Sequence, residues 1–265
     1  MKFIEKYKID NDTLKMTLAN NNILKLSFVN SLRRVILSEI PIYVLDKIEY
    51  IENNTSLNDQ ILGRRLNLLP IINDNTDNYD NIELELDVTN ENEEQYIKTV
   101  YANDFKINNS NKKVSDIIKF PKIIFTKLKY GNKVHLKSKL KESTAKESGS
   151  AYCPVNIMTV LFQRDEKKIK KMLKDIKDPK KRDDFIKYDS NRIYLKNDKN
   201  EPQKYNLTIE ASGVMKLKTI LLKSIEVIEN KIKLFKSNYI DDDSEDVYIQ
   251  KQKSSLGGID IIIKN

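Results

Sequence analysis

The sequence predicts an α+β fold, in which short strands with alternating side chains are combined with amphipathic helices. Residues 82–88 and 205–211 alternate apolar and polar side chains with a period of two, as half-exposed strands do. Residues 28–40 carry apolar side chains at helical spacing and end at a proline. Residues 214–237 repeat apolar side chains every three or four positions, which predicts the longest helix of the chain.

The composition suits a globular protein with a strongly hydrated surface. At 265 residues the chain can bury a substantial core, as one large domain or two. Charged residues make up 32% and hydrophobic residues 39%. No stretch reaches the roughly 18 uninterrupted apolar residues of a membrane span, and we expect no signal peptide. The net charge of +8 comes mostly from scattered lysines, which favours a solvated basic surface.

Catalysis and metal binding find little support in the sequence. The single cysteine, Cys153, and the single histidine, His135, cannot build a disulfide or a His/Cys metal cluster. None of the six glycines lies in a phosphate-binding pattern. Asp241, Asp242 and Asp243 follow a predicted helix in a polar tail, whereas clustered aspartates that hold magnesium need a rigid loop. We therefore predict that the chain has no active site and no cofactor.

Residues 2–28 are predicted to form three strands, because apolar side chains recur there at every second position. The first helix follows, with the Ser27 hydroxyl as its N-cap and Pro41 as its terminator. The apolar face of this helix consists of Phe28, Leu32, Val35, Ile36 and Ile40.

A strand from Tyr43 to Tyr50 leads to a second helix, which Asn58 is predicted to cap and which ends before Pro70. Asp59 favours the positive N-terminal end of this helix. Its predicted buried stripe is Ile61, Leu62, Leu66 and Leu69. Each helix carries two adjacent arginines, which are Arg33 and Arg34 in the first and Arg64 and Arg65 in the second.

The rest of the chain continues the mixture of strands and helices. A lysine-rich segment at 163–188 predicts an amphipathic helix with a thin apolar stripe, and an acidic stretch at 241–246 is expected to be exposed. Strands are predicted at 82–88, 96–107, 122–128, 134–140, 155–162, 205–211 and 257–263. The stripe of the long helix is Leu217, Leu221, Ile225, Ile228, Ile232 and Phe235.

Several motifs stand in a fixed order along the chain. They are Asn30-Ser31-Leu32-Arg33-Arg34, Glu39-Ile40-Pro41, Leu45-Asp46, Asn54-Thr55-Ser56-Leu57-Asn58-Asp59, Arg65-Leu66-Asn67-Leu68-Leu69-Pro70 and Ile209-Glu210-Ala211-Ser212-Gly213. This series resembles the signature of the alpha-like subunits of multisubunit RNA polymerases. That family includes the archaeal D subunit, the third subunit of eukaryotic RNA polymerase II and the bacterial alpha amino-terminal domain. The loop at 145–154 departs from the family, because Ser148 and Ser150 replace a histidine and a basic residue.

The resemblance implies a fold of two interleaved parts. A dimerisation domain would comprise residues 1–45 and 155–240, with a charged insertion at about 163–200 that is similar to that of subunits encoded by large DNA viruses. A β-rich insert domain would comprise residues 46–154, and an acidic tail with a possible terminal strand residues 241–265. Zinc or an iron–sulfur cluster, which some members bind, is not expected in a chain with one cysteine.

The resemblance also implies a function. The chain would be a non-catalytic scaffold that pairs with a smaller alpha-like subunit and nucleates assembly of the second-largest and largest polymerase subunits. It would contact DNA only through the complex and would not contact a membrane. Its location would be intracellular, in the nucleus, or in the cytoplasm or virion for an archaeal or viral protein.

The expected binding residues fall into two groups. The dimer interface would consist of Phe28, Leu32, Val35, Ile36, Leu217, Leu221, Ile225, Ile228, Ile232 and Phe235. The contact with the large subunits would consist of Arg33, Arg34, Arg64 and Arg65, with Arg34 at the position that the resemblance marks as important for docking. A guanidinium can clamp a carboxylate or backbone carbonyls of a partner. The alternative for Arg33 and Arg34 is an ion pair within the chain, to Glu39 or Asp59.

Two other functions compete with the scaffold. The first is a free-standing basic nucleic-acid-binding protein that uses the segment at 163–188, and it predicts strongly salt-dependent DNA affinity. The second is a nucleotidyltransferase in its own right, against which the missing motifs argue. A scaffold, by contrast, is expected to be insoluble or self-associated alone and soluble with its partner.

Overall fold

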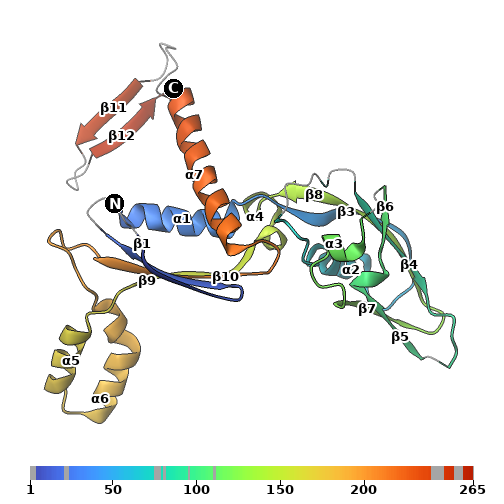
Figure 1. The fold of residues 1–265 in the computed structure, drawn as a ribbon, viewed down its shortest axis with the longest axis horizontal. Helices are drawn as coiled ribbons and strands as arrows, with labels where there is room; N and C mark the ends of the chain where they lie inside the picture. Colours follow the sequence, from blue (N-terminus) through green and yellow to red (C-terminus); the bar gives the residue numbers. More distant parts are fainter. Residues whose placement is uncertain are drawn as a thin grey trace. The chain divides into compact units, whose positions relative to one another are not determined.

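The computed structural model describes residues 4–20, 24–74, 79, 82–94, 96–109, 112–239, 248–253 and 259–264. It confirms the α+β fold, with antiparallel sheets and separate helices (Figure 1). The chain divides into two compact units, residues 1–224 and 225–265, and we describe each by itself. No helix in the described ranges combines the length and the apolar character needed to cross a membrane.

The first sheet of the larger unit joins strands from the two ends of that unit. Its order is β1 (Ile4–Asp10), β2 (Thr13–Ala19), β10 (Lys204–Ala211) and β9 (Val155–Phe162), and all neighbours are antiparallel. Helix α1 (Leu26–Ser38) lies against β9 and buries Val29, Leu32, Val35 and Ile36. Residues almost 200 positions apart in the sequence therefore share one core.

The second sheet belongs to the middle of the chain. Its order is β3 (Ile42–Asn53), β8 (Lys133–Ser143), β4 (Glu83–Thr89) and β6 (Lys106–Asn108), and a separate pair is formed by β5 (Ile97–Tyr101) and β7 (Ile124–Lys129). Helices α2 (Asp59–Asn67) and α3 (Val114–Ile117) contribute to the same core. Its fully buried members include Leu45, Leu62, Leu66, Leu84, Leu86, Phe125 and Leu136.

Short helices and turns connect these strands. A turn at Tyr130-Gly131 joins β7 to β8, and Gly131 has a φ of +76°, a conformation that glycine adopts without strain. The remaining segments of this unit are the 3-10 helices η1 (Ala102–Asp104), η2 (Ser150–Tyr152) and η4 (Ser190–Arg192), the helices α4 (Ala145–Ser148), α5 (Glu166–Asp175) and α6 (Pro179–Asp184), and the π-helical turn η3 (Phe185–Asp189).

The smaller unit contains most of helix α7 (Leu217–Tyr239) and a hairpin of β11 (Tyr248–Lys253) and β12 (Ile259–Lys264). The hairpin confirms a final strand close to the predicted one. The acidic stretch at 241–246 lies outside the described residues.

Four details of the sequence prediction are wrong. The third strand before residue 28 does not form, because α1 already begins at Leu26. Ser27 therefore lies inside the helix, and its N-cap is Lys25, whose side chain makes no capping bond. Ile61 is exposed rather than buried. The predicted helix at 163–188 is two helices, because Pro179 begins α6 and the residue before a proline is driven out of the helical conformation.

Other predictions for the second helix are confirmed. The Asn58 Oδ1 atom accepts a hydrogen bond of 2.9 Å from the Ile61 amide, and Asp59 lies in the first turn. Local hydrogen bonds stabilise the loop before this helix. The Asn53 side chain donates to the Leu57 carbonyl at 2.9 Å and to the Asp59 carboxylate at 2.8 Å. These signature residues stabilise a loop of their own chain.

Gly63 of α2 lies where a larger residue has no room. A methyl group there would stand 2.4 Å from the hydroxyl oxygen of Tyr50, which donates a 2.6 Å hydrogen bond to the Asp59 carbonyl. We expect Gly63→Ala to lower the melting temperature, because overpacking costs about 1–3 kcal/mol and outweighs the roughly 1 kcal/mol of helix propensity that alanine gains.

The matched control removes the Tyr50 hydroxyl group, with which the new methyl group would clash. In a Tyr50→Phe background the same Gly63→Ala change should cost at least about 1 kcal/mol less free energy of unfolding, because the clashing oxygen is gone. Urea unfolding of the four proteins measures both differences. An equal cost in the two backgrounds would show that the Tyr50 hydroxyl does not set the constraint.

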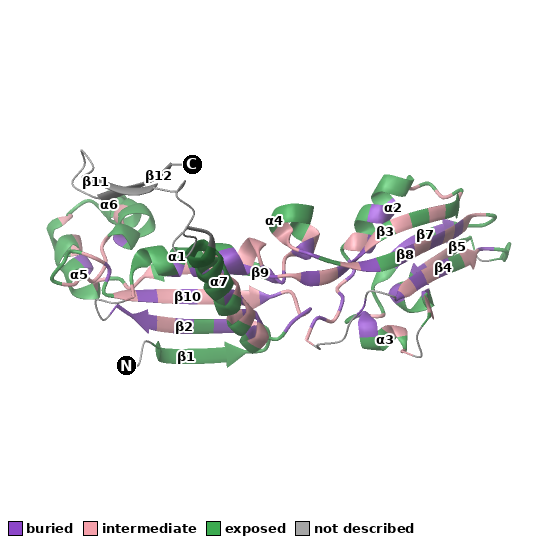
Figure 2. Cartoon of the chain, turned by 90° about the horizontal axis from the view of Figure 1, so that it is seen from above, coloured by how far each residue is buried: buried purple, intermediate pink, exposed green. Residues whose placement is uncertain are grey.

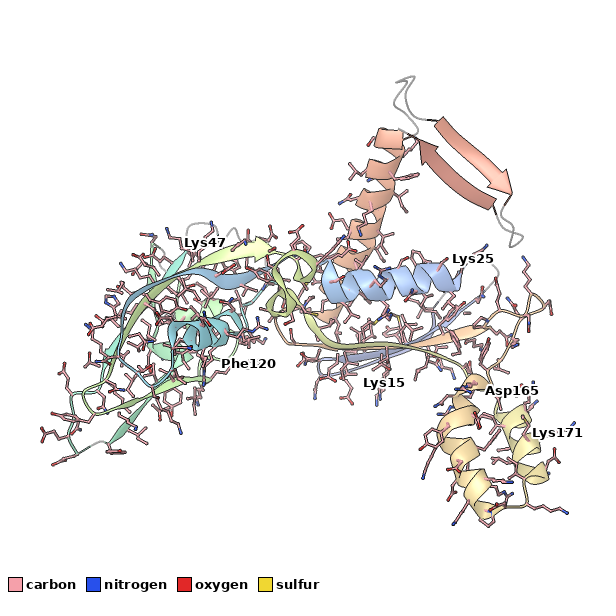
Figure 3. All side chains as sticks on the ribbon, turned by 180° about the vertical axis from the view of Figure 1, so that it is seen from behind. Lys15, Lys25, Lys47, Phe120, Asp165 and Lys171 are labelled. Carbon is pink, nitrogen blue, oxygen red and sulfur yellow. The ribbon has the colours of Figure 1, made fainter. Side chains whose placement is uncertain are left out.

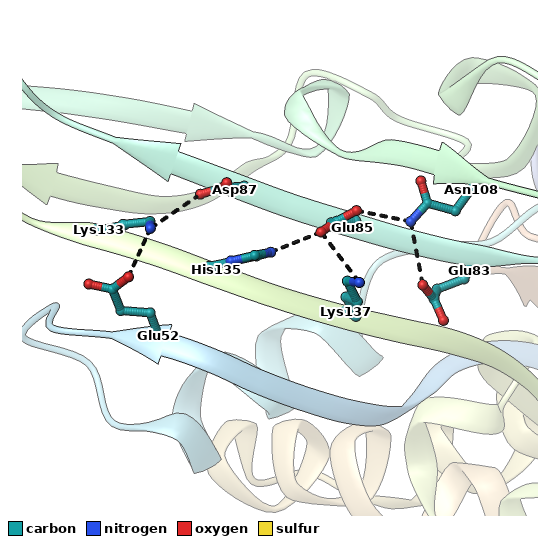
Figure 4. Close-up of polar contacts among 8 residues, drawn as sticks. All are labelled: Glu52, Glu83, Glu85, Asp87, Asn108, Lys133, His135 and Lys137. Atoms are coloured by element: carbon teal, nitrogen blue, oxygen red, sulfur yellow. Dashed lines mark hydrogen bonds and ion pairs between the residues drawn. The ribbon is translucent and has the colours of Figure 1, made fainter.

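The outer face of the second sheet carries a ladder of opposite charges (Figure 4). The Glu85 carboxylate accepts a hydrogen bond of 2.9 Å from the Asn108 amide, lies 2.8 Å from His135 Nε2 and 3.7 Å from Lys137 Nζ. These contacts, with the hydrogen bond from Asn108 as the largest cause, lower the pKa of Glu85 from 4.5 to about 2. His135 is thus a strand residue paired with a carboxylate on the sheet surface.

The lowered pKa of Glu85 predicts a pH dependence of stability. A carboxylate whose pKa is lower in the folded chain stabilises it above the unfolded pKa, and this contribution is lost as the pH falls through the folded pKa. Glu85→Gln should therefore be less stable than the wild type at pH 7, and the difference should shrink between pH 4.5 and about 2. Thermal unfolding across that range measures it, and a constant difference would contradict this role.

Candidate partner-binding surface

The apolar face of the first sheet extends beyond the residues that the chain itself covers. Directly opposite residues of antiparallel strands share one face of a sheet. Three such rows cross the four strands, namely Ile9–Leu14–Ile209–Met158, Tyr7–Met16–Leu207–Val160 and Ile4–Leu18–Tyr205–Phe162. The members on β2 and β10 are buried, but Tyr7 is 71% exposed and Ile9 56% exposed on β1. Figure 2 shows β1 exposed along its whole length.

The predicted interface residues of α1 separate into two groups. Leu32, Val35 and Ile36 lie in the core of the chain itself, because this face of the helix packs on the sheet. Phe28 is exposed, and so is Leu26, the first residue of the same helix. Only the N-terminal turn of α1 therefore offers apolar side chains to a partner.

Helix α7 presents more apolar surface. Leu217 is buried, whereas Leu221 and Ile228 are half-buried. Ile225, Ile232 and Phe235 are exposed at 51%, 63% and 43%. Leu222 and Leu234 are also exposed, and the sequence analysis did not assign them to the interface. Such large exposed apolar side chains on one helix are typical of a binding surface.

The arginines of α1 differ in their contacts. The Nε atom of Arg33 donates a hydrogen bond of 3.2 Å to Asn30 Oδ1. Arg34 is exposed, and among the described residues its guanidinium makes no hydrogen bond or ion pair. An ion pair from Arg33 or Arg34 to Asp59 or Glu39 is absent from that part of the chain as well. Within the described part of the chain, the Arg34 side chain is therefore exposed and makes no polar side-chain contact of its own.

The arginines of α2 bind their own chain. Arg64 donates a hydrogen bond of 3.0 Å to the Ser150 hydroxyl, and Arg65 donates one of 3.1 Å to the Ile124 carbonyl. Both remain exposed. Ser150, the acceptor of the Arg64 hydrogen bond, is one of the two positions where the loop departs from the pattern of the resembling family.

The thiol of Cys153 is half-buried and hydrogen-bonded within the chain. Burial raises the pKa of the Cys153 thiol, which donates a hydrogen bond of 3.0 Å to the Val155 carbonyl. Nearby, burial and a 3.0 Å hydrogen bond from its hydroxyl to Asp46 raise the pKa of Tyr152. These groups connect η2 to β3 and to the start of β9.

No group of three or more possible metal ligands gathers among the described residues. The expectation of a chain without metal remains a prediction. We expect elemental analysis of the purified protein to find less than 0.1 equivalent of zinc or iron, on the order of a contaminant, because four good ligands cannot come from one cysteine and one histidine. One tightly held equivalent would reveal a carboxylate site.

Comparison with known proteins decides the family. Residues 24–232 match the model of the RNA polymerase Rpb3/Rpb11 dimerisation domain. The chain belongs to the Rpb3/Rpo3-type, alpha-like subunits of RNA polymerase. The match spans most of the chain and includes α1, the second sheet, strands β9 and β10 of the first sheet and the larger part of α7. Members of this family are non-catalytic subunits of DNA-directed RNA polymerase, as the sequence analysis predicts.

Individual relatives of the Rpb3/Rpo3 type agree with this placement. The DNA-directed RNA polymerase II subunit rpb3 of Dictyostelium discoideum is 25% identical over 286 aligned residues, which cover 86% of this chain and 92% of that protein. The subunit Rpo3 of Pyrococcus horikoshii is 25% identical over 240 residues, 79% of this chain and 88% of that protein. The Rpo3 of Pyrococcus furiosus is 36% identical over 98 residues, 36% of each chain.

Proposed function

We propose that this Rpb3/Rpo3-type subunit is an intracellular assembly scaffold that pairs with a smaller alpha-like subunit. The exposed apolar surface on α7 carries the proposal, because Ile225 and Ile232 are too exposed to stabilise the chain that contains them. The uncovered apolar residues of β1 give independent support, since they continue a sheet face that is otherwise buried.

The proposed interface differs from the one predicted from the sequence, because it leaves out the residues that are buried in the chain itself. We assign to it the exposed residues Phe28, Leu222, Ile225, Ile232 and Phe235, together with the half-buried Leu221 and Ile228. Leu234 is not assigned to it, because it lies on the side of α7 opposite Ile232. Leu32, Val35, Ile36 and Leu217 are buried in the chain itself and are left out as well. A partner that covers the exposed group replaces water by apolar contacts, which supplies the main driving force of association.

We assign the dimerisation domain to residues 1–45 and 155–240 and the insert domain to residues 46–154. The pairing of β2 with β10 supports this division, because one sheet then contains strands from both dimerisation segments. Arg34 is the proposed contact with the second-largest subunit, and its unoccupied guanidinium supports that role. We retain Arg33, Arg64 and Arg65 only as secondary contacts, since each has a partner in its own chain.

Co-expression tests the proposal. The chain is produced alone and together with the smaller alpha-like subunit of the same source, and each sample is analysed by gel filtration with light scattering. We expect aggregation or self-association of the chain alone and a soluble 1:1 complex in the second sample. A stable monomer that ignores the smaller subunit would refute the scaffold function.

A further inference from the structure

Residues 163–203 form a helical arm that leaves the first sheet between β9 and β10 and contains α5 and α6 (Figure 1). Its base continues the two strands. The Gln163 amide donates to the Lys204 carbonyl at 3.1 Å, and the Leu195 amide donates to the Gln163 carbonyl at 2.9 Å. The Asp165 carboxylate caps α5 by accepting a 3.0 Å hydrogen bond from the Lys168 amide. The arm is therefore an ordered projection with a fixed attachment.

One side of α5 consists of lysine side chains alone. Lys167, Lys170, Lys171 and Lys174 are spaced by three, one and three residues, which places them within about 100° on the helix surface. We call these four residues the lysine face. All four are exposed, and Figure 3 shows the Lys171 side chain at the outer side of its helix. Along the axis they extend over about 10 Å.

The lysine face is not neutralised by its own chain. Glu166 and Asp175 lie at its borders, four residues from Lys170 and Lys171 respectively. In the described part of the arm, however, no ion pair joins either carboxylate to a lysine of the face. Lys168 and Lys177 add positive charge beside it. The arm therefore presents a concentrated positive charge to the solvent.

The residue types indicate which anion is expected. The face contains no arginine, and the Arg182 guanidinium is occupied, since its Nε atom donates to the Leu173 carbonyl at 3.2 Å and ties α6 to α5. Ammonium groups without a planar fork favour contacts with phosphates that do not depend on sequence. The face also lacks aromatic side chains, on which the bases of a single strand would stack.

A lipid surface fits the arm less well. Helices that bind membranes insert a free apolar side into the bilayer. In α5 most of that side is already used, because Ile169 is buried and Leu173 is half-buried within the chain, which leaves Met172 as the exposed apolar side chain of the helix. Duplex DNA carries one negative charge per about 1.7 Å of its axis, so about 10 Å of helix can face several phosphates at once.

We propose that the lysine face of α5 binds the phosphate backbone of duplex DNA. This inference goes beyond the scaffold function and replaces the expectation that the chain contacts DNA only through the complex. It also differs from a free-standing DNA-binding protein, because the arm belongs to a polymerase subunit. The arm would hold DNA against the polymerase without reading its sequence.

Fluorescence anisotropy with a labelled 30-base-pair duplex, roughly one hundred Å long by the rise of B-DNA, tests the proposal. The protein is the full chain, in complex with its smaller partner where that is needed for solubility. The test variant changes all four lysines of the face to glutamine, which keeps helix propensity. Affinity at 50 mM salt should fall at least about tenfold, and the slope of log affinity against log salt should decrease by about 3, since each phosphate contact contributes roughly 0.9.

A matched variant controls for net charge. Lys119, Lys122, Lys127 and Lys129 are exposed and lie outside the arm, and their change to glutamine removes the same charge. If the affinity depends on contacts of the lysine face with phosphates rather than on net charge, this control should lose less than about twofold in affinity. A double variant, Lys167→Gln with Lys171→Gln, should show about half of the decrease in salt slope that the fourfold variant shows. Melting temperatures verify that all variants fold.

Three results would overturn the proposal. The first is wild-type affinity in the variant of the lysine face, and the second is an equal loss in the control. The third is tighter binding of the wild type to single-stranded RNA or to phosphatidylserine vesicles than to the duplex, which would assign the arm to a different partner.

Discussion

Ile232→Asp in helix α7 should leave the chain folded and abolish its binding to the smaller alpha-like subunit. Ile232 is 63% exposed, so the unbound chain loses little when it is replaced. In the complex a carboxylate would be buried against apolar side chains, which costs several kcal/mol. The expected loss is at least about 2 kcal/mol of binding free energy, or roughly 30-fold in Kd, as for an interface hot spot. Isothermal titration calorimetry or competition gel filtration measures it.

The structure also provides controls for this experiment. Asn230→Asp places the same carboxylate on the opposite side of α7 and should bind the partner normally. Ile225→Asp should behave like Ile232→Asp. Leu221→Asp and Ile228→Asp are less decisive, because these residues are half-buried in the chain itself and their replacement affects folding as well. Retention of partner binding by both Ile225→Asp and Ile232→Asp would remove α7 from the interface.

Arg34→Ala should separate assembly from dimerisation. Among the described residues the Arg34 guanidinium has no partner, so the melting temperature and the heterodimer should be unchanged. Recruitment of the second-largest subunit in a pull-down should fall at least about 30-fold, because truncation of one partner of a buried charge pair costs about 2–5 kcal/mol.

Two further variants distinguish a specific contact of the Arg34 guanidinium from a general effect of positive charge. Arg34→Lys keeps the charge but loses the planar fork, so it should restore only part of the recruitment. Lys25→Ala removes one exposed charge from the N-terminus of the same helix and should have no effect. A lower melting temperature of Arg34→Ala with recruitment reduced only in proportion would indicate a structural role. Normal recruitment by a stable Arg34→Ala protein would exclude the residue from the contact.

Sequence patterns predicted the elements of this chain better than their burial. Leu24, Leu26 and Phe28 alternate like a strand, yet α1 begins at Leu26, because the face that the helix buries consists of Val29, Leu32, Val35 and Ile36, which follow at helical spacing. Periodicity counts every apolar side chain as buried, and it therefore misplaced Ile61. Apolar residues on an exposed binding surface produce the same spacing in the sequence as apolar residues of the core.

Long-range pairing was not readable from local patterns either. β2 and β10 are separated by almost 200 residues, and only the resemblance to a family implied that they belong to one domain. The cap at Asn58 was predictable because its side chain bonds within the same turn. The contacts of Arg64 and Arg65 depend on residues 86 and 59 positions away, respectively, and the sequence offered no signal for them.

Copurification from the native source tests the scaffold function most directly. The chain is tagged, isolated at about physiological salt, where weak surface ion pairs are screened, and its partners are identified and quantified by mass spectrometry. We predict a smaller alpha-like subunit in equal amount, together with the second-largest and largest subunits of an RNA polymerase. Isolation of the chain alone, or only as a homodimer, would contradict the proposal.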